Sequence, residues 1–524
     1  MKLLTFALFP AIAALPPCAP LVAQPHANAQ LLLDPPADSW PQYHGDYSGR
    51  RNVPYTQITP RNVRSLALAW AFQTNQGAEI KSSPILVDGI LYFTVPDNVW
   101  AVDARSGHLI WHYNRPSSEG LHIGHRGVAI DKGFLYFTTP DVHLICLSAK
   151  DGKVRWDKTF GDVSKGYWST MAPLVVRNHI IVGVSGDFDN LQGFLKSFDP
   201  ETGDLQWTWN ATSPAGVPNQ STGGMTWMTG TYDPELNLIY WGTGNPTPVL
   251  SGKTRPGDNL YTCSIVAINP DNGELRWAFQ PSPHDTHDWD AVETPVLVDA
   301  AFRGRQRKML MQASRNGYFF VLDRTNGKSL LTVPYGPVNW ANGIDAKGQP
   351  ISNPAKEPAP DGRIIAPDEG GLTNYRAPSF DPKTGLFIVD AHPSWSIYFA
   401  KRADGAYGWA GADYGIWGEG RIDAIDYQTG KVRWSHFVGE GGSGAGVLTT
   451  ASGLTVTGDS HGNVLVLSTE NGDTLWHSGT GAPIQSSPIS YVLDGRQYIL
   501  TGSGSVLFAW ALPEGSIDAQ HSGD

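Results

Sequence analysis

The sequence predicts an all-β protein, an eight-bladed β-propeller made of four-stranded antiparallel blades with tryptophan-docking repeats. Three observations predict it: a repeated hairpin motif, the spacing of its copies, and a composition rich in turn residues. The motif reads apolar-x-Asp/Asn/Ser-x-x-polar-Gly-x-x-x-Trp, and its six intact copies span residues 101–111, 146–156, 197–207, 267–277, 424–434 and 466–476. In each copy an apolar strand enters a polar turn, glycine takes a conformation that other residues resist, and a second strand leaves with alternating side chains. Each copy therefore predicts a β-hairpin.

The spacing of the copies sets the number of blades. A seventh copy, 321–331, ends in Leu331 instead of tryptophan. The motif glycines recur mostly at steps of roughly 40 to 70 residues, the size of a four-stranded blade. The longer step from Gly327 to Gly430 contains a weaker hairpin at 380–389, which brings the expected number of blades to eight.

Tryptophan follows the motif glycine by four residues in every intact copy. This constant offset predicts one indole ring packed between each blade and the next, with about 200 Å² buried apiece. The C-terminal strand at 506–510 is expected to complete a blade begun near the N-terminus, because such closure removes the open edges of a linear array.

Composition agrees with short strands joined by many turns. The chain has 58 glycines and 39 prolines, and only 17% of its residues are charged. No long amphipathic helical pattern interrupts it. We therefore expect one propeller domain over 30–514 and a C-terminal tail over 515–524. The formal charge of −11 argues against a nucleic acid or an anionic membrane as partner.

The N-terminus reads as a targeting segment. Lys2 precedes an apolar run at 3–15, and Ala27-Asn28-Ala29 is a suitable cleavage site, with Ala23 as an alternative. We expect a signal peptide over 1–29 and export to the periplasm. Lipid attachment at Cys18 is not expected, because two prolines precede this cysteine where small residues are needed. No later stretch is apolar for long enough to suggest a transmembrane anchor.

The two remaining cysteines, Cys146 and Cys263, lie in apolar strand contexts and predict buried free thiols instead of a disulfide. The sequence contains no Cys-x-x-Cys-His motif for covalent attachment of haem.

The densest polar cluster is PHDTHDWD at 283–290. If this segment is extended, Asp288 and Asp290 point to one side, and Asp285 and His287 to the other. Two carboxylates on one face must pair with cations, bind a metal ion, or have raised pKa values. The alternative is a solvated surface loop.

A second unusual segment is GTGNP at 242–246. Its Asn245 is a neutral oxygen donor held between glycine and proline, which suits a hard cation. The alternative is an ordinary turn.

Several motifs together resemble the quinoprotein alcohol dehydrogenases. They are Trp227, GTGNP at 242–246, RPGDN at 255–259, PHD at 283–285, and SRNG at 314–317 followed by LDRT at 322–325. They match in order and spacing, and the resemblance extends from Trp40 onward. Members of the family are eight-bladed propellers that bind pyrroloquinoline quinone (PQQ) and a metal ion on the central axis.

The resemblance implies a role for individual residues. Asp288 matches the catalytic base, and Arg315 matches the cation beside the reactive C5 carbonyl and a neighbouring carboxylate of the quinone. Arg126 matches an arginine that binds a carboxylate of the cofactor. The further cofactor contacts implied are Trp227, on which the quinone stacks, and Thr170, Ser185 and Gly186.

The resemblance also implies a metal site. Asn245 matches a metal ligand, and Asp290 falls where lanthanide-using members have an extra carboxylate. The metal-binding glutamate of the family falls on Phe188, with Asp187 and Asp189 beside it. The interpretation is a Ca²⁺ or lanthanide site formed by Asn245, Asp288, Asp290 and Asp187, in which three carboxylates favour the trivalent ion. The alternative is that Phe188 fills the place of the metal and that Asp288 and Asp290 pair with Arg315 or Arg126.

Other positions also depart from the family pattern. The adjacent-cysteine disulfide that covers the quinone is absent near Gly120. Lys81, His392 and Gly444 stand where a glutamate, an asparagine and a tryptophan are usual. These departures predict a more open cofactor pocket. The insert at 334–373 is expected to cover one face of the molecule.

The favoured hypothesis is an exported PQQ-dependent dehydrogenase that oxidises an alcohol or a sugar-type hydroxyl. It would pass electrons to a separate acceptor such as a soluble cytochrome c, because the chain has no haem motif. The alternative is a related propeller that has lost the cofactor and acts as a binding or scaffold protein, since fold alone does not establish an activity.

Overall fold

The computed structural model describes residues 29–188, 190–212, 221–401, 408–440 and 444–514. The signal peptide expected at 1–29 lies outside these ranges except for Ala29, which begins the short helix α1 (Ala29–Leu33). The C-terminal tail expected at 515–524 and the candidate ligand Asp189 also lie outside them. In the part of the chain that is described, no helix is long and apolar enough to cross a membrane.

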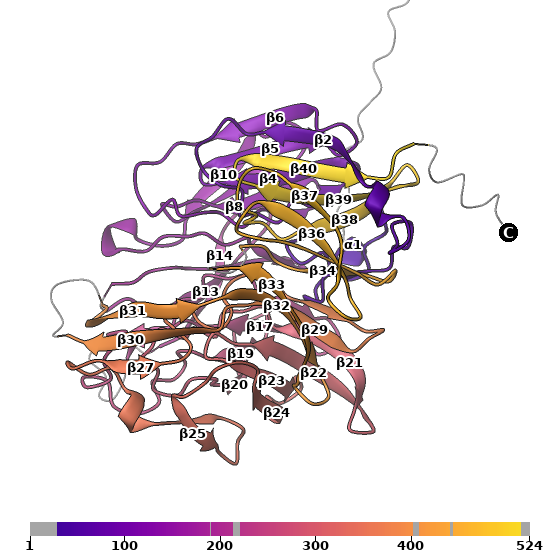
Figure 1. The fold of residues 1–524 in the computed structure, drawn as a ribbon. Helices are drawn as coiled ribbons and strands as arrows, with labels where there is room; N and C mark the ends of the chain where they lie inside the picture. The colour runs from indigo at the N-terminus through magenta and orange to yellow at the C-terminus, as the bar shows by residue number, and fades with distance from the viewer. Residues whose placement is uncertain (1–28, 189, 213–220, 402–407, 441–443, 515–524) are drawn as a thin grey trace, which may run out of the picture.

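Antiparallel sheets follow one another along the chain (Figure 1). The first sheet contains β3 (Ile85–Val87), β4 (Ile90–Val95), β5 (Asn98–Asp103) and β6 (Leu109–Asn114), and the second contains β7 (Ala129–Asp131), β8 (Phe134–Thr138), β9 (His143–Ser148) and β10 (Val154–Thr159). The third contains β11 (Leu174–Val176), β12 (His179–Gly183), β13 (Phe194–Phe198) and β14 (Leu205–Asn210). The fourth contains β16 (Thr231–Asp233), β17 (Leu238–Gly242), β19 (Ile265–Ile268) and β20 (Leu275–Phe279).

The fifth sheet contains β21 (Val296–Phe302), β22 (Arg305–Ala313), β23 (Tyr318–Asp323) and β24 (Lys328–Pro334), and the sixth contains β28 (Ser379–Asp381), β29 (Leu386–Ala391), β32 (Gly420–Asp426) and β33 (Val432–Gly439). The seventh contains β34 (Leu448–Thr450), β35 (Leu454–Gly458), β36 (Asn463–Ser468) and β37 (Thr474–Gly479), and β1 (Asn52–Val53) pairs with its first strand. The last contains β38 (Ile489–Leu493), β39 (Arg496–Ser503), β40 (Val506–Ala511) and β2 (Ala67–Gln73). These are the four-stranded antiparallel sheets of a β-propeller, as the hairpin motif predicts.

Burial follows the order of the strands within a sheet. The first strands are buried on both faces, as in β3 and β7, whereas the fourth strands β6 and β10 alternate between exposed and half-buried residues. A strand with neighbours on both faces needs apolar side chains throughout, and a strand at the rim needs them on one face only. The first strand of each sheet therefore lies toward the interior and the fourth strand lies at the rim.

The predicted docking of tryptophans is present. The motif glycines all have left-handed φ values, from 69° at Gly152 to 77° at Gly472, as the turn requires. Five of the six motif tryptophans, and Trp70 of β2, pack on the motif glycine of the next sheet, and their indole N–H groups donate to a carbonyl of that turn. These hydrogen bonds are Trp70 to Ala104, Trp111 to Ala149, Trp156 to Pro200, Trp207 to Pro270, Trp277 to Arg324 and Trp434 to Thr469, at 2.7–3.3 Å. The sixth motif tryptophan, Trp476, lies edge-on to Trp510.

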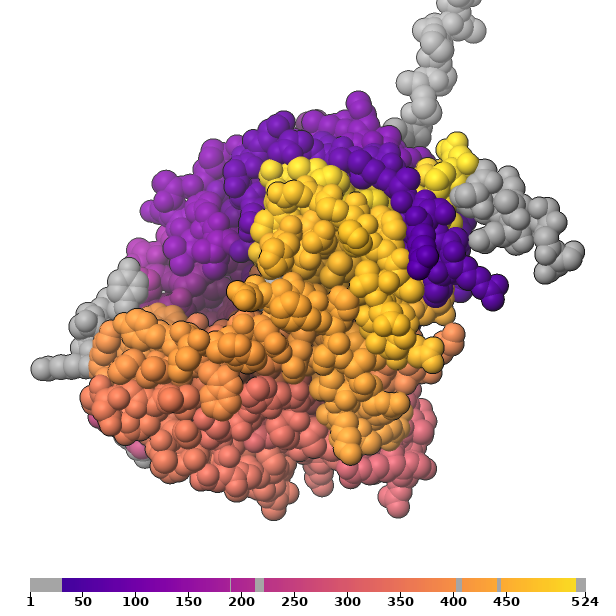
Figure 2. Space-filling model, in the orientation of Figure 1, coloured from indigo at the N-terminus to yellow at the C-terminus, as the bar shows by residue number. Residues whose placement is uncertain are grey.

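Strand β2, near the N-terminus, and the last strand, β40, close the ring. β2 pairs antiparallel with β40, with Ala67 opposite Ala511 and Gln73 opposite Val506. The two strands lie side by side in Figure 1, and Figure 2 shows the indigo N-terminal part of the chain in contact with the yellow C-terminal part. The expectation for the C-terminal strand is confirmed.

The segment 37–53 crosses one end of the sheets and hydrogen-bonds to the first strand of several of them. These bonds join Ala37 to Val492, Trp40 to Leu86, Tyr47 to Tyr232, Ser48 to Leu297, Arg50 to Phe380 and Arg51 to Thr449, at 2.7–3.1 Å. The buried Arg51 side chain adds hydrogen bonds to the carbonyls of Tyr43 and Pro488. This segment therefore ties the interior ends of distant sheets together.

Short elements lie outside the main sheets. They are β15 (Thr222–Gly223) with β18 (Pro246–Thr247), β25 (Ala341–Ile344) with β26 (Pro350–Ser352), the sheet of β27 (Arg363–Ile365), β30 (Ser394–Ala400) and β31 (Gly411–Gly418), and the 3₁₀ helices η1 (Val63–Ser65), η2 (Val163–Lys165) and η3 (Pro354–Lys356). The insert at 334–373 thus carries strands, and its last residues reach the cavity described below. Cys146 and Cys263 are buried free thiols, as predicted.

Candidate active site

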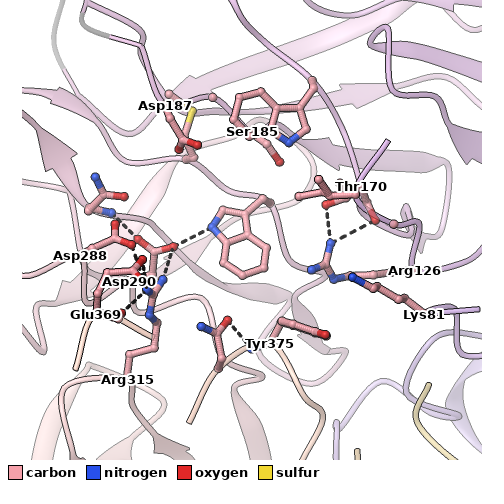
Figure 3. Close-up of a pocket in the computed structure, with 18 of the residues that line it drawn as sticks. Lys81, Arg126, Thr170, Ser185, Asp187, Asp288, Asp290, Arg315, Glu369 and Tyr375 are labelled. Atoms are coloured by element: carbon pink, nitrogen blue, oxygen red, sulfur yellow. Dashed lines mark hydrogen bonds and ion pairs between the residues drawn. The ribbon is translucent and has the colours of Figure 1, made fainter. Parts of the chain in front are cut away.

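A cavity of ≈ 280 Å³ gathers every site residue predicted from the sequence (Figure 3). Loops before the first strand and after the second strand of successive sheets contribute them. The predicted residues that line it are Arg126, Thr170, Ser185, Gly186, Asp187, Trp227, Asn245, Asp288, Asp290 and Arg315. These residues are widely separated in the chain, so the propeller brings them together.

The cluster at 283–290 is a buried loop organised by Asp285. One carboxylate oxygen of Asp285 accepts hydrogen bonds from the backbone N–H groups of His287, Asp288 and Trp289 at 2.9–3.3 Å. Burial raises the pKa of Asp285 to about 6, against the nearby charge of Arg255. The surface-loop alternative is wrong, since all residues from 285 to 290 are buried.

The backbone of this loop is not extended, which was the condition under which the sequence placed Asp288 and Asp290 on one side. Asp288 has φ 69°, in the left-handed region that aspartate adopts more readily than most residues. The two carboxylates nevertheless share one side, because Asp288 and Asp290 both contact the same guanidinium. Backbone strain at such a residue is typical of functional sites.

Arg315, in the turn between β22 and β23, holds the carboxylates together. Its guanidinium lies 2.9 Å from Asp288, 3.2 Å from Asp290 and 3.5 Å from Glu369. Burial opposes the charge of Arg315, but these three carboxylates outweigh it and hold its pKa above the ordinary value. Burial raises the pKa of Asp288 well above its usual range, although Arg315 counteracts it.

Asp290 links three other site residues. One of its oxygens accepts from the indole N–H of Trp227 at 2.7 Å, and the other accepts from the backbone N–H of Asn245 at 2.6 Å. Burial raises the pKa of Asp290 against the effect of Arg315 and these donors. Asp290 therefore fixes the orientation of the Trp227 ring relative to the acidic side of the cavity.

Arg126 lies on the opposite side. Its guanidinium is 4.9 Å from the ring centre of Trp227 and 4.8 Å from that of Tyr375, and it donates to the carbonyl and hydroxyl of Thr170. Burial lowers its pKa. Within the described ranges, the hydrogen bonds of the Arg126 side chain go to Thr170 and not to a carboxylate, and its Nε has no hydrogen-bond partner. A buried cation of this kind requires an anion.

Phe188 does not fill the cavity. It packs next to Gly166 and against the apolar cluster around β12 and β13, and the preceding Asp187 lines the cavity instead. Burial, followed by Asp290 and Glu369, raises the pKa of Asp187 to about 6. The other half of that alternative is observed, because Asp288 and Asp290 do pair with Arg315.

The three other residues that depart from the family pattern, Lys81, His392 and Gly444, do not all lie at the cavity. Lys81 lines the cavity, whereas His392 and Gly444 do not. His392 lies 3.7 Å from Asp368, and Gly444 lies against Ile484 and Gln485. In the described part of the chain, no group of three His, Cys, Asp or Glu side chains is already arranged as a metal site.

The sequence interpretation missed several lining residues. Glu369 and Tyr375 are the most important, and the others include Trp168, Met225 and Trp409. Glu369 lies in Pro367-Asp368-Glu369-Gly370-Gly371 at the end of the insert. The acidic pair between proline and glycines could have indicated a functional loop, but nothing in the sequence relates this pair to Arg315.

Comparisons with known proteins show which family the chain belongs to. The family described as "PQQ: Glucose/ethanol/alcohol dehydrogenase, beta-propeller domain" matches residues 40–360 and 416–499. The quinoprotein alcohol dehydrogenase PedH of Pseudomonas putida is 32% identical over 91% of this chain and 88% of its own length. The lanthanide-dependent methanol dehydrogenase of Methylacidiphilum fumariolicum is 30% identical over 91% of this chain and 87% of its own.

A solved structure is also similar. The quinohemoprotein alcohol dehydrogenase of Comamonas testosteroni superposes with a TM-score of 0.85 at 30% identity, covering 91% of this chain and 80% of that one. The chain therefore belongs to the family of PQQ-dependent glucose, ethanol and alcohol dehydrogenases with a β-propeller domain.

Proposed function

We propose that the protein is an exported dehydrogenase that oxidises an alcohol with PQQ and a Ca²⁺ or lanthanide ion bound in the cavity. The observation that carries the proposal is the combination of a buried carboxylate base, Asp288, with an uncompensated buried cation, Arg126, in one cavity. A scaffold has no need for either charge in its interior.

The residues of the cavity fit PQQ, which is a flat tricarboxylate quinone. Trp227 offers an indole ring whose orientation is fixed by Asp290. Arg126 is a buried cation that needs an anion, and Thr170 holds it in place. Ser185 and Gly186 line the same cavity and can provide further polar contacts. An aromatic face beside a carboxylate-binding cation suits a planar acid.

The donor set fits a hard cation. Four carboxylates, Asp187, Asp288, Asp290 and Glu369, line the cavity together with Asn245, and all can offer oxygen atoms. Against the single guanidinium of Arg315, these carboxylates leave a formal charge of −3. A trivalent ion balances that charge more completely than a divalent ion of similar size. We therefore propose Asn245, Asp288, Asp290 and Asp187 as metal ligands, with Glu369 nearby.

The roles of the chain's own residues follow from this geometry. When bound, PQQ supplies a hydride acceptor, and the metal ion supplies Lewis acidity. Asp288 accepts the proton of the substrate hydroxyl at its carboxylate, and its raised pKa makes it a stronger base than an exposed aspartate. Arg315 orients Asp288 and provides a fixed positive charge for the negative charge that develops beside it.

Three further parts of the proposal rest on the sequence and on the order of the sheets. Electrons leave to a separate acceptor such as a soluble cytochrome c, since the chain has no haem-attachment motif. The apolar N-terminal run supports export to the periplasm. The order of the sheets and the contact of β2 with β40 support an eight-bladed ring over 30–514.

Reconstitution tests the proposal. Purified protein is mixed with PQQ and either La³⁺ or Ca²⁺, and its absorbance spectrum and the alcohol-dependent reduction of a dye are recorded. We expect a bound quinone spectrum and dye reduction that depends on both PQQ and metal. A protein that binds no PQQ under any of these conditions would instead be the related propeller without cofactor.

A further inference from the structure

Lys81 projects into the cavity from a rigid part of the chain. The neighbouring Ile80, Ser82 and Ser83 are buried, whereas Lys81 itself is half-buried. The N–H of Ile80 donates to the carbonyl of Gly504 at 2.7 Å, and the N–H of Ser83 donates to the carbonyl of Arg126 at 3.0 Å. These contacts fix the backbone of Lys81 and join it directly to the segment that carries Arg126.

Gly124 leaves room for the Lys81 side chain. It has φ 154°, and a Cβ atom there would lie 2.6 Å from Cδ of Lys81. The methylene groups of Lys81 therefore pass across the bare backbone of Gly124. Figure 3 shows Lys81 and Arg126 together at one side of the cavity, with Asp288, Asp290, Glu369 and Arg315 at the other.

The two sides differ in charge compensation. Arg315 contacts three carboxylates, so its charge is already balanced within the protein. Neither Lys81 nor Arg126 has a carboxylate within 4.0 Å in the part of the chain that the structure describes. Two unpaired cations facing one partly buried space repel each other and call for an anion with more than one negative charge.

We infer that Lys81 binds a second carboxylate of the quinone cofactor, beside the one bound by Arg126. This inference rests on the proposed function, because it takes PQQ as the occupant of the cavity. A flat tricarboxylate on the Trp227 ring can present two of its carboxylates to this side and leave its quinone oxygens toward Asp288. Lys81 is then a cofactor-binding residue that sets affinity for PQQ, and it takes no part in proton transfer.

The test measures PQQ binding to the apoprotein, by quenching of tryptophan fluorescence, for the native chain and three variants. Lys81→Gln removes the charge, Lys81→Arg keeps it, and Lys81→Glu reverses it. We expect dissociation constants about 10-fold or more weaker for Lys81→Gln, weaker still for Lys81→Glu, and within a few-fold of native for Lys81→Arg. The matched control is Lys153→Gln. Lys153 is an exposed lysine in the turn between β9 and β10, so this variant should bind PQQ as the native chain does.

Two further measurements separate a direct role from a structural one. Added NaCl should weaken PQQ binding more steeply in the native chain than in Lys81→Gln, because the variant makes one fewer ionic contact. The melting temperature of the apoprotein should not fall in Lys81→Gln, since an unpaired cation beside Arg126 is removed. If Lys81→Gln is poorly folded, the comparison of Lys81→Arg with Lys81→Glu still decides the sign of the charge effect.

The possible failures are distinguishable. If the native chain does not bind PQQ, the proposed function fails and the inference fails with it. If the native chain binds PQQ and Lys81→Gln and Lys81→Glu bind it equally well, the inference alone is overturned.

Discussion

The guanidinium of Arg315 donates to the carboxylate of Asp288 over 2.9 Å and so joins the loop before β21 to the turn between β22 and β23. The same guanidinium contacts Asp290, which in turn accepts from Trp227. The proposed base, the proposed cofactor platform and the acidic side of the cavity therefore form one connected unit.

The role of Asp288 can be tested with Asp288→Asn. The amide keeps the shape of the side chain but cannot accept a proton, so turnover should fall by about 10² or more. PQQ binding and the melting temperature should remain close to those of the native protein. The measurement is dye-linked alcohol oxidation after reconstitution, beside a thermal melt. Equal activity would exclude Asp288 as the base, and loss of folding would indicate a structural role for the loop.

The choice of ion can be tested by thermal melts of the apoprotein with PQQ and either La³⁺ or Ca²⁺. We expect La³⁺ to raise the melting temperature more and to support more quinone reduction, because the carboxylates around Arg315 leave a formal charge of −3. Asp290→Asn should reduce the difference in melting temperature and in quinone reduction between La³⁺ and Ca²⁺. If neither ion raises the melting temperature and neither supports quinone reduction with short alcohols, the metal site is not functional.

Tryptophan docking can be tested at Gly472. An added Cβ would lie 2.6 Å from the Trp434 ring, whereas at Gly453, which also has a positive φ, nothing lies within 4 Å. Both Gly→Ala substitutions carry the cost of a left-handed alanine. Gly472→Ala should lose about 1 to 3 kcal/mol more unfolding free energy than Gly453→Ala, because it also overpacks the interface between sheets. Urea denaturation measures both, and equal losses would show that the ring does not constrain the turn.

The buried His44 should make stability depend on pH. Burial, reinforced by Arg51, lowers its pKa to about 3, from 6.5 in the unfolded chain. The unfolded chain therefore binds a proton that the folded protein does not, and this stabilising contribution is lost as the pH falls below 6.5. Relative to His44→Gln, the native protein should lose about 2 kcal/mol of unfolding free energy between pH 7.5 and pH 5. A difference that does not change with pH would mean that His44 takes up its proton with the same pKa in the folded protein as in the unfolded chain.

The fold could be predicted because its signal is repeated. One glycine and one tryptophan at a fixed offset specify a turn and the contact with the next sheet, and each copy supports the others. Even the copy that ends in Leu331 keeps its hairpin, because Gly327 still packs on Trp277 of the preceding sheet. The closing strand followed from the need to remove open edges.

The candidate site was predictable only in part. The sequence indicated which residues gather, because their motifs match a family, but not how they pair. The contact of Glu369 with Arg315 joins an insert to a turn 54 residues earlier, and no local pattern encodes it. The position of Asp187 depends on Phe188 finding space beside Gly166, which is a matter of packing. The left-handed Asp288 likewise depends on Asp285 capping the loop.

The pairing of β2 with β40 also determines when the molecule can finish folding. Ala67 pairs with Ala511, so almost the whole chain has to be synthesised before the ring can close. Until then β39 lacks one of its two neighbouring strands, and β2 is an unpaired strand with exposed backbone groups. Unpaired strand edges favour association between chains. Closing a loop of this length is slow compared with forming any single hairpin. Chains that end before β40 should therefore retain most of their hairpins and yet aggregate.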